Sequence, residues 1–157
     1  MHVIRRAEPR DTEAVLRLLV QVNMVHHLGR PDLFKGPATK YSAEELAEIF
    51  ADDRRPVFVY EDAQGRVQGY AFCIVQQYVG SPLMTDIKTL YIDDLCVEET
   101  ARGKHIGRSL YDYVLDYARG IGCYNVTLNV WTLNPNALRF YEKCGMTPQK
   151  IGMEKIL

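Results

Sequence analysis

The chain has 157 residues, of which 47% are hydrophobic and 25% are charged, and its formal net charge is −1. This length and composition predict one soluble globular domain, 1–157, with a core of its own. The small net charge argues against a nucleic-acid partner bound over a broad basic face, and no apolar run reaches the roughly 20 residues that span a bilayer. The first residues also lack the apolar segment of a signal peptide, so we expect a cytoplasmic protein.

The first part of the chain predicts a short strand, two helices and a hairpin. Asp11 is a capping residue, and the apolar residues after it recur at helical spacing until about Met24. Ser42 and Glu45 form the capping-box pattern that starts a second helix. Two β-prone runs flank the turn Asp62–Gly65 and predict a hairpin. The elements are a strand at Val3–Arg5, helices at 12–24 and 43–51, and strands at Val57–Tyr60 and Val67–Val79.

The segment Val25–Thr39 separates the two helices and carries Gly29, Pro31 and Gly36. Glycine and proline interrupt helical periodicity, so we interpret the segment as a loop or a broken helix. Specificity is often placed in such loops. The segment therefore either forms a wall of a substrate pocket or simply covers the sheet, and the sequence does not decide between these.

The second part of the chain alternates strands with helices. Gly120 and Gly122 stand where one helix should stop, and Asn134–Pro135 opens the last helix, which Gly145 ends. The order β-α-α-β-β-β-α-β-α-β predicts an α+β fold with a mixed sheet. The elements are a strand at Leu90–Val97, a helix at Ile106–Ile121, a strand at Asn125–Trp131, a helix at 135–144 and a terminal β segment at Met146–Leu157.

Cysteine and histidine form no recognisable set of metal ligands. His26 and His27 are adjacent, but no third ligand stands near them, so we interpret them as loop or surface residues. The cysteines form no Cys-x-x-Cys pair, and their spacing fits neither a zinc site nor a disulfide framework. We therefore expect no metal, and a packing role for all four: Cys73, Cys96, Cys123 and Cys144.

Two acidic residues, Asp93 and Asp94, lie side by side in an otherwise apolar strand. Successive strand residues face opposite sides of a sheet, so at least one of them would point into the protein if both faces were covered. An unpaired buried carboxylate is costly. We therefore expect the strand to be bulged or splayed here, or the acids to face a wet cleft, with a pair of solvated acids near the strand end as the alternative.

A basic, glycine-containing loop joins this strand to the next helix. Free backbone N–H groups and the helix dipole favour an anion at a helix start, and a bound phosphate would also explain why basic side chains gather there. The alternative is an ordinary helix start with solvated charges. The loop lacks the Gly-Lys-Ser/Thr of a P-loop, which disfavours a plain nucleotide-binding protein. Its residues are Arg102, Gly103, Lys104, His105, Ile106, Gly107 and Arg108.

Two motifs, at Arg102–Gly107 and Asn134–Met146, follow each other along the chain. The first matches Arg/Gln-x-x-Gly-x-Gly/Ala except that His105 replaces a glycine, and the second matches Asn-x-x-Ala-x-x-x-Tyr-Glu-Lys-x-Gly-Phe with Met146 in the last place. Together they resemble the GNAT superfamily of N-acetyltransferases. The resemblance implies a GNAT-like mixed, mostly antiparallel sheet, flanked by helices on both faces, with a splayed central strand pair.

The resemblance also implies acetyl-CoA as donor substrate and assigns residues to its parts. Backbone groups of Leu95, Cys96 and Val97 would hold the pantetheine arm and the thioester. Backbone N–H groups of Arg102–Arg108 would bind the pyrophosphate. Histidine tolerates positive φ better than most residues, so we expect the His105→Gly variant to bind CoA at least as tightly as the wild type.

The second motif supplies the remaining residues that the resemblance implies. Asn134 would contact the CoA arm or fix the helix start, and Ala137 belongs to the same CoA-binding motif. Tyr141 would contact CoA and act as the general acid that protonates the departing thiolate. A tyrosine that only packs on an amphipathic helix is the alternative.

The acidic pair fits the acceptor half of such a reaction. A free alkylamine has a pKa of about 10.4 and must lose a proton before it attacks a thioester. Asp93 or Asp94 could accept that proton directly or through water, and Asp93 is the first choice because some polyamine-acetylating relatives carry an acidic pair on this strand. Trp131 would either line the acceptor pocket or pack in the core.

The sequence therefore predicts an acetyl-CoA-dependent N-acetyltransferase acting on a small amine, preferably a cationic one, or on a protein amine. The alternative from another class is a catalytically silent CoA-binding sensor or partner module. A homodimer is implied by the resemblance alone. We expect no nucleic-acid or membrane partner.

Overall fold

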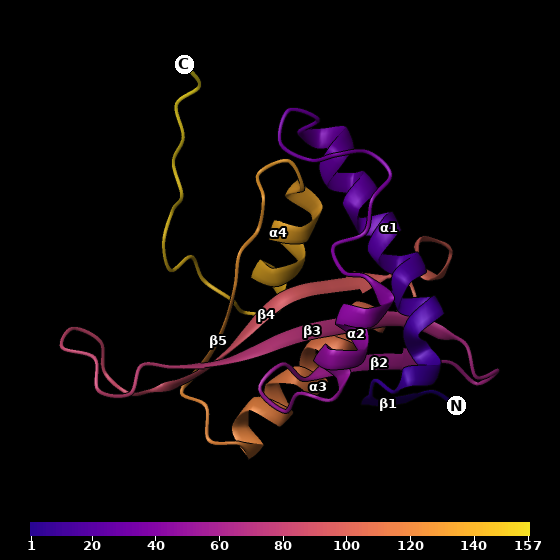
Figure 1. Cartoon of the computed structure of the whole chain (residues 1–157), viewed down its shortest axis with the longest axis horizontal. Helices are drawn as coiled ribbons and strands as arrows, with labels where there is room; N and C mark the ends of the chain where they lie inside the picture. Colours follow the sequence, from indigo (N-terminus) through magenta and orange to yellow (C-terminus); the bar gives the residue numbers. More distant parts are fainter.

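The computed structural model describes residues 1–157 and contains one five-stranded sheet with the order β1-β2-β3-β4-β5. Neighbouring strands are antiparallel except for β4 and β5, which are parallel. This confirms the α+β fold with a mixed, mostly antiparallel sheet (Figure 1). The elements are β1 (Val3–Arg6), α1 (Thr12–Gly29), α2 (Ala43–Phe50), β2 (Val57–Glu61), β3 (Val67–Gln77), β4 (Lys88–Val97), α3 (Ile106–Gly120), β5 (Asn125–Leu128) and α4 (Pro135–Lys143).

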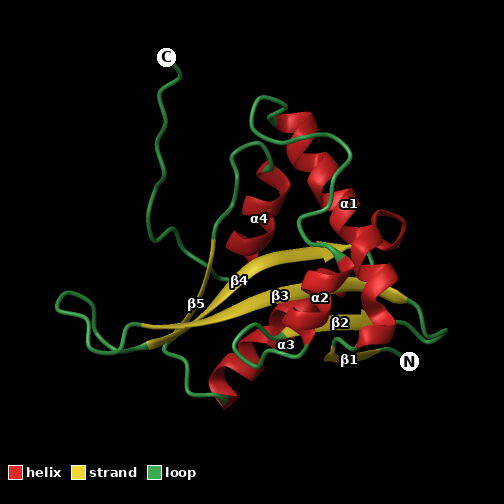
Figure 2. Ribbon diagram, in the orientation of Figure 1, coloured by secondary structure: helices red, strands yellow, loops and turns green.

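Helices cover both faces of the sheet, and each face has its own buried cluster (Figure 2). Strand β3 shows how the sequence divides between them. Tyr70 and Phe72 belong to the cluster under α1 and α2, whereas Ala71 and Cys73 belong to the cluster under α3. Successive side chains of a strand point to opposite faces, so a strand that is apolar at every position requires cover on both sides. No helix of the structure is both long and apolar enough to cross a membrane.

Helix α2 begins where its capping pattern predicts. The backbone N–H of Glu45 donates to Ser42 Oγ at 3.1 Å, and the N–H of Ser42 donates to Glu45 Oε1 at 3.0 Å. The first turn of a helix has N–H groups without intrahelical acceptors, and this pair of bonds satisfies two of them. The helix then turns Leu46, Ile49 and Phe50 toward the core.

Helix α1 is longer than the sequence predicts, because it continues past Met24 to Gly29. No proline or glycine interrupts it before Gly29, and the N–H of Arg30 still bonds the carbonyl of His26 at 2.8 Å. A Cβ atom on Gly29 would come within 2.7 Å of Leu133 Cβ, so this end of the helix packs closely on the segment before α4. Only the part of the chain after Gly29 forms the predicted loop.

The predicted terminal strand is wrong. Met146 bonds the carbonyl of Tyr141, but no backbone hydrogen bond forms from Thr147 to Leu157. These last residues leave the body of the molecule as an extended, exposed segment, drawn in yellow in Figure 1. A β segment needs a neighbour for its N–H and C=O groups, and this one has none within the chain. Strand β5 likewise ends at Leu128, where its pairing with β4 ends, rather than at Trp131.

Candidate active site

Strand β4 is bulged at the acidic pair. Ile92 pairs with Cys73 and Asp94 pairs with Phe72, so Asp93 is an extra residue that has no partner on β3. A bulge of this kind bends the strand and turns side chains away from strict alternation. This confirms the expectation that the two adjacent acids break the regular strand, and both of them line one cavity.

Strands β4 and β5 separate immediately beside the bulge. Their parallel pairing runs from Thr89 opposite Asn125 to Ile92 opposite Leu128 and then stops, although β4 continues to Val97. In Figure 1 the two strands diverge beyond this point. The backbone of Asp93–Val97 therefore has no strand on its β5 side, which is the splayed pair that the resemblance implies.

The cleft at this split has a volume of about 540 Å³. Helix α1, the loop before α2, the bulged part of β4, the segment after β5 and helix α4 all contribute to its walls. It brings together six of the predicted site residues from distant parts of the chain: Asp93, Asp94, Leu95, Asn134, Ala137 and Tyr141. The loop before α2 contributes Phe34, Thr39 and Lys40, so part of the irregular segment forms a wall of this cleft.

Asp94 is held by a buried tyrosine. The hydroxyl group of Tyr70 donates to Asp94 Oδ2 at 2.5 Å, and the Tyr70 side chain is fully buried. Burial raises the pKa of Asp94 to about 6, although the Tyr70 hydrogen bond acts in the opposite direction. A carboxylate with this pKa is ionised at pH 7 and is a stronger base than an ordinary aspartate.

Asp93 has different partners, because it accepts hydrogen bonds from two residues of the loop before α2. Lys40 Nζ lies 2.7 Å from Asp93 Oδ2, and the Tyr41 hydroxyl lies 3.1 Å from the same oxygen. Burial acts to lower the pKa of Lys40, but the bond to Asp93 and its charge outweigh this effect, so the pKa is raised. An ammonium group thus already occupies the cleft beside the acidic pair.

Tyr141 lies on α4 and faces the same cleft as the two acids. Burial raises its pKa above the ordinary tyrosine value, and the charge of Asp94 raises it further. The hydroxyl group therefore remains protonated at neutral pH. A phenol that keeps its proton can donate it to a leaving group.

Asn134 fixes the start of α4, because Asn134 Oδ1 accepts from the N–H of Ala137 at 3.2 Å. On β4, Leu95 lines the cleft. The side chain of Cys96 instead turns into the core under α1, where its Sγ lies 3.7 Å from the carbonyl oxygen of Leu18. Only the backbone of Cys96 is therefore placed to serve a ligand in the split.

The basic loop before α3 has free backbone donors. The N–H groups from Gly103 to Arg108 have no acceptor within the protein. His105 is the only non-glycine residue with positive φ, at 61°, and it is the residue that caps α3; Gly103 also has positive φ, at 87°. These left-handed positions turn the chain sharply before the helix begins. The arrangement fits the anion-binding loop that the sequence predicts.

Three contacts of the cleft were missed by sequence reasoning: those of Tyr70, Lys40 and Tyr41 with the acidic pair. The partners are 24, 53 and 52 residues apart along the chain, so no local pattern joins them. His26 also lines the cleft, and burial together with the charge of Lys40 lowers its pKa. His27 instead lies 2.7 Å from the carbonyl oxygen of Phe34 through Nδ1 and supports the loop.

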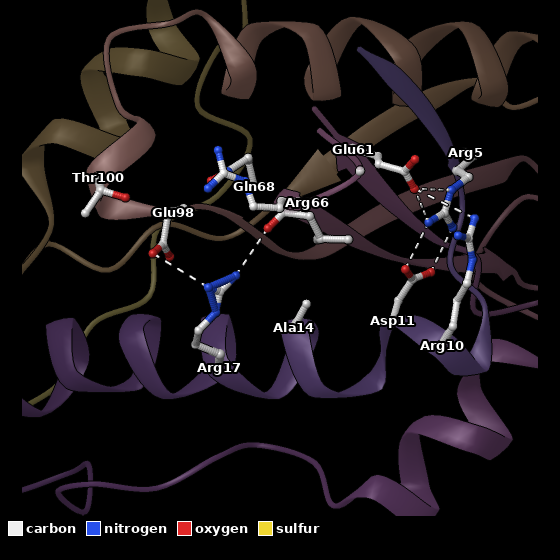
Figure 3. A pocket seen from close by; sticks show the side chains of 12 residues that line it. Arg5, Arg10, Asp11, Ala14, Arg17, Glu61, Arg66, Gln68, Glu98 and Thr100 are labelled. Carbon is white, nitrogen blue, oxygen red and sulfur yellow. Dashed lines mark hydrogen bonds and ion pairs between the residues drawn. The ribbon is translucent and has the colours of Figure 1, made fainter. Parts of the chain in front are cut away.

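A second cavity, of about 400 Å³, lies between α1 and the β2–β3 hairpin (Figure 3). None of the predicted site residues lines it. Arg5 donates to both carboxylate oxygens of Asp11, at 2.8 and 2.9 Å, and to Glu61 at 2.6 Å. Arg17 points to Glu98 and bonds the carbonyl oxygen of Val67. Every charged side chain that lines this cavity has an ion-pair partner.

A comparison with models of protein families assigns the chain to a family that agrees with its fold and its split sheet. The chain belongs to the acetyltransferase (GNAT) family, whose model matches residues 22–146. It is an acetyl-CoA-dependent N-acetyltransferase, which confirms the resemblance that the two sequence motifs indicate.

Two of the similar curated proteins are glucosamine 6-phosphate N-acetyltransferases of plants. The chain is 28% identical over 111 residues to glucosamine 6-phosphate N-acetyltransferase of Arabidopsis thaliana, covering 71% of this chain and 70% of that protein. It is 32% identical over 111 residues to glucosamine 6-phosphate N-acetyltransferase 1 of Oryza sativa subsp. japonica, covering 70% of this chain and 62% of that protein.

Solved structures extend the similarity to the whole chain. A crystallised mutant of the BH1408 protein of Bacillus halodurans is 32% identical, with a TM-score of 0.94 over 99% of both chains, so the match extends into the C-terminal segment. The crystal structure of glucosamine-6-phosphate N-acetyltransferase from Arabidopsis thaliana matches with a TM-score of 0.73 at 26% identity, over 99% of this chain and 98% of that one.

Proposed function

We propose that the protein transfers the acetyl group of acetyl-CoA to the primary amine of a small molecule bound in the cleft between β4 and β5. One observation carries the proposal: a carboxylate with a raised pKa and a protonated tyrosine, from elements far apart in the sequence, line the same cleft. A base and an acid that share a cavity are what direct acyl transfer to an amine requires.

The donor would be held by backbone groups. Acetyl-CoA supplies an activated thioester when it is bound. The free N–H groups of Gly103–Arg108 fit its pyrophosphate, and the β4 backbone beyond Ile92 offers groups without a strand partner to the pantetheine arm. An N–H of this stretch can donate to the thioester oxygen, where negative charge develops during attack.

The acceptor side assigns different tasks to the two acids. Asp94 takes the proton from the attacking ammonium group, because burial raises its pKa to about 6 and no ion pair occupies its carboxylate. Asp93 binds the cationic amine, as it binds Lys40 now. The amine then forms the new C–N bond as the C–S bond breaks, and Tyr141 gives its proton to the departing thiolate.

Lys40 indicates the kind of acceptor that fits. Its ammonium group lies where an acceptor amine would lie, and binding of that amine would release Lys40 into the cleft. A freed lysine beside the bound amine favours an acceptor that also carries an anionic group. The relatives named after glucosamine 6-phosphate, which has an amine and a phosphate, make such amino sugar phosphates the first acceptors to examine.

An acceptor screen tests the proposal. Thiol release from acetyl-CoA is measured with amino sugars, amino sugar phosphates, polyamines, aminoglycosides and lysine peptides. We expect turnover with a small amine and little with peptides. If CoA binds in calorimetry but no amine releases thiol above the background, the protein is a silent CoA-binding module and the proposal fails.

A further inference from the structure

The loop between α1 and α2 places a primary amine of the chain itself at the acidic pair of the cleft. Lys40 Nζ lies 2.7 Å from Asp93 Oδ2. The same cleft is lined by Asp94 and Tyr141, to which the proposed acetyl transfer assigns the base and the acid. A lysine amine is a nucleophile toward carbonyl groups once it has lost its proton. Lys40 therefore lies where an acceptor amine would lie, and it belongs to the same chemical class as that acceptor.

Contacts on both sides of this lysine fix the loop that carries it. The hydroxyl group of Tyr41, the next residue, donates to the same oxygen of Asp93 at 3.1 Å. The ring of Tyr41 stacks on Phe72, with 5.5 Å between the ring centroids. Earlier in the loop, the ring of Phe34 meets Trp131 edge to face, with 5.1 Å between the centroids. The loop is therefore anchored at the cleft, and the ammonium group is held beside the acids rather than reaching them from a free surface chain.

No other lysine lines this cleft. Lys35 lies in the same loop and is exposed, and Lys88 Nζ donates to the carbonyl oxygen of Ile121 at 2.8 Å, just beyond the end of α3. The other lysines of the chain are Lys35, Lys88, Lys104, Lys143, Lys150 and Lys155. Transfer catalysed in the cleft would modify one lysine, whereas spontaneous reaction with acetyl-CoA would modify exposed lysines without this preference.

We propose, on the basis of the acetyl transfer proposed above, that this protein acetylates its own Lys40 when acetyl-CoA is bound and no acceptor amine occupies the cleft. The ammonium group gives one proton to Asp94, which passes it to the solvent. Lys40 Nζ then attacks the carbonyl carbon of the thioester, so that the N–C bond forms and the C–S bond breaks. The departing thiolate takes the proton of Tyr141, and the surplus proton of the nitrogen restores that hydroxyl group as the amide forms.

Self-acetylation would change the charge of the cleft. An acetylated lysine is neutral, so Asp93 would lose its ion pair and keep the hydrogen bond from Tyr41. A cationic acceptor could then bind Asp93 without displacing an ammonium group. An acceptor with an anionic group would lose the lysine that could meet it. The modification would therefore change which amines the cleft accepts.

Peptide mass spectrometry tests the modified position. The protein is incubated with acetyl-CoA that carries a deuterated acetyl group, in a buffer without amines, and light and deuterated acetyl groups are counted on each lysine. We expect Lys40 to be acetylated at least about tenfold more than Lys35, because only Lys40 has the base and the acid beside it. The Tyr141→Phe variant should lower the labelling of Lys40 to the level of Lys35, whereas the matched Tyr111→Phe variant should keep it.

A mixing experiment tests whether each chain modifies itself. Wild type and Tyr141→Phe chains, which differ in mass, are incubated together with the labelled acetyl-CoA. We expect the acetyl group on wild-type chains alone, at a rate per chain that does not depend on protein concentration. The proposal is overturned if Lys40 is labelled no faster than Lys35, if it is labelled equally in Tyr141→Phe, or if the variant chains gain the label from the wild type.

The outcome is separable from that of the acceptor screen. Repeated turnover of a small amine while Lys40 stays unmodified would refute self-acetylation and leave the proposed function intact. One acetyl group on Lys40, with no turnover of any amine, would refute the small-molecule acceptor and support self-acetylation.

Discussion

The two cavities of this protein use the same kinds of charged residues in opposite ways. In the cavity between α1 and the β2–β3 hairpin, Arg5 lies between Asp11 and Glu61 and bonds both. In the cleft between β4 and β5, Asp94 has no ion-pair partner, and the side chain that bonds it is an uncharged tyrosine. The first arrangement stabilises each charge where it lies, and the second leaves a carboxylate available to take up a proton.

The pKa shifts express this difference. Asp11 is 4% exposed, and although burial acts to raise its pKa, the bonds from Arg5 and from the N–H of Glu8 outweigh burial and lower it. Asp94 has its pKa raised to about 6 by burial, because the Tyr70 hydrogen bond and the charge of Lys40 offset burial only in part. A buried carboxylate is therefore not by itself a sign of function, whereas a buried carboxylate without an ion-pair partner is a candidate base. The following variants test this contrast, from the largest expected effect to the smallest.

The Tyr141→Phe variant should have the largest effect on catalysis. Removal of the general acid should lower turnover about 100- to 1,000-fold, while acetyl-CoA affinity changes little. Thiol release gives turnover and calorimetry gives affinity. Tyr111→Phe is the matched control, since its ring lies 6.3 Å from that of Tyr141 but does not line the cleft. Turnover within about threefold of the wild type would show that another group or water is the acid.

The Asp94→Asn variant should lower kcat/KM about 100-fold and remove one limb of the pH profile. In the wild type, kcat/KM should fall as the pH drops through about 6, because protonation abolishes the base. The pH dependence of kcat/KM from pH 5 to 8 provides the measurement. A wild-type profile that is flat through pH 6 would exclude Asp94 as the base.

The Asp11→Asn variant should affect stability instead of chemistry. Removing one partner of a buried ion pair costs about 3 kcal/mol of unfolding free energy, because Arg5 loses its main acceptor. The folded-state pKa of Asp11 is lowered, so its contribution is present above the unfolded value of 3.8 and is lost as the pH falls through the folded value. The loss of unfolding free energy relative to the wild type, measured by urea unfolding, should therefore be larger at pH 7 than at pH 3.

The control for this variant is Asp53→Asn, which removes an exposed partner of Arg6. Exposed ion pairs contribute roughly 0–1 kcal/mol, so its unfolding curve should nearly match the wild type. If both variants lost the same unfolding free energy, the ion pairs of the cavity between α1 and the β2–β3 hairpin would be no more stabilising than exposed ones.

The Lys40→Met variant should change acceptor binding by a smaller factor. The acceptor amine no longer has to displace an ammonium group from Asp93, so KM for a simple cationic amine should fall about threefold to tenfold. For an amine that carries a phosphate, KM should instead rise, because the released lysine no longer meets that anion. Lys35→Met, in the same loop, is the control. Equal changes for both acceptors would contradict the role given to Lys40.

The His105→Gly variant should have the smallest effect. Glycine adopts positive φ without the strain of about 1 kcal/mol that a side chain brings, so the loop should form equally well or better. CoA affinity measured by calorimetry should be equal to or higher than that of the wild type. Clearly weaker binding would mean that the imidazole contacts the ligand. Lys104→Gly, at ordinary φ, should not show the gain.

Sequence patterns predicted most of the fold because its signals are local. Ser42 with Glu45, and Asn134 with Pro135, start helices at the predicted places. The predicted end of α1, near Met24, is too early. The glycines and prolines from Gly29 onward suggested a loop for the whole segment Val25–Thr39, but no glycine or proline precedes Gly29 and the helix continues to that residue. The segment Thr147–Leu157 shows the opposite error, since its residues suit a strand but no strand of the chain pairs with it.

The candidate site was predictable in part. Two adjacent acids interrupt the apolar pattern of a strand, so Asp93 and Asp94 can be recognised as candidate site residues from the sequence alone. The separate roles proposed for the two acids, base and cation-binding group, could not be predicted. They depend on the contacts of Tyr70 with Asp94 and of Lys40 with Asp93, and both partners lie in other parts of the chain. The sequence favoured Asp93 as the base, whereas the contacts favour Asp94 for that role and Asp93 for binding the cation.

The bulge at Asp93 has a consequence for how β4 tolerates insertions and deletions. Before it, Leu90 and Ile92 face the core under α3; after it, Cys96 faces the core under α1. Ile92 and Asp94 already pair with neighbouring residues of β3, so removing Asp93 would restore strict alternation and leave Asp94 and Cys96 on their present faces. Removing any other single residue of β4 after the bulge would instead exchange the faces of the residues that follow it. Deletion of Asp93 should therefore cost the fold less than deletion of Leu95, although it removes the carboxylate that binds Lys40.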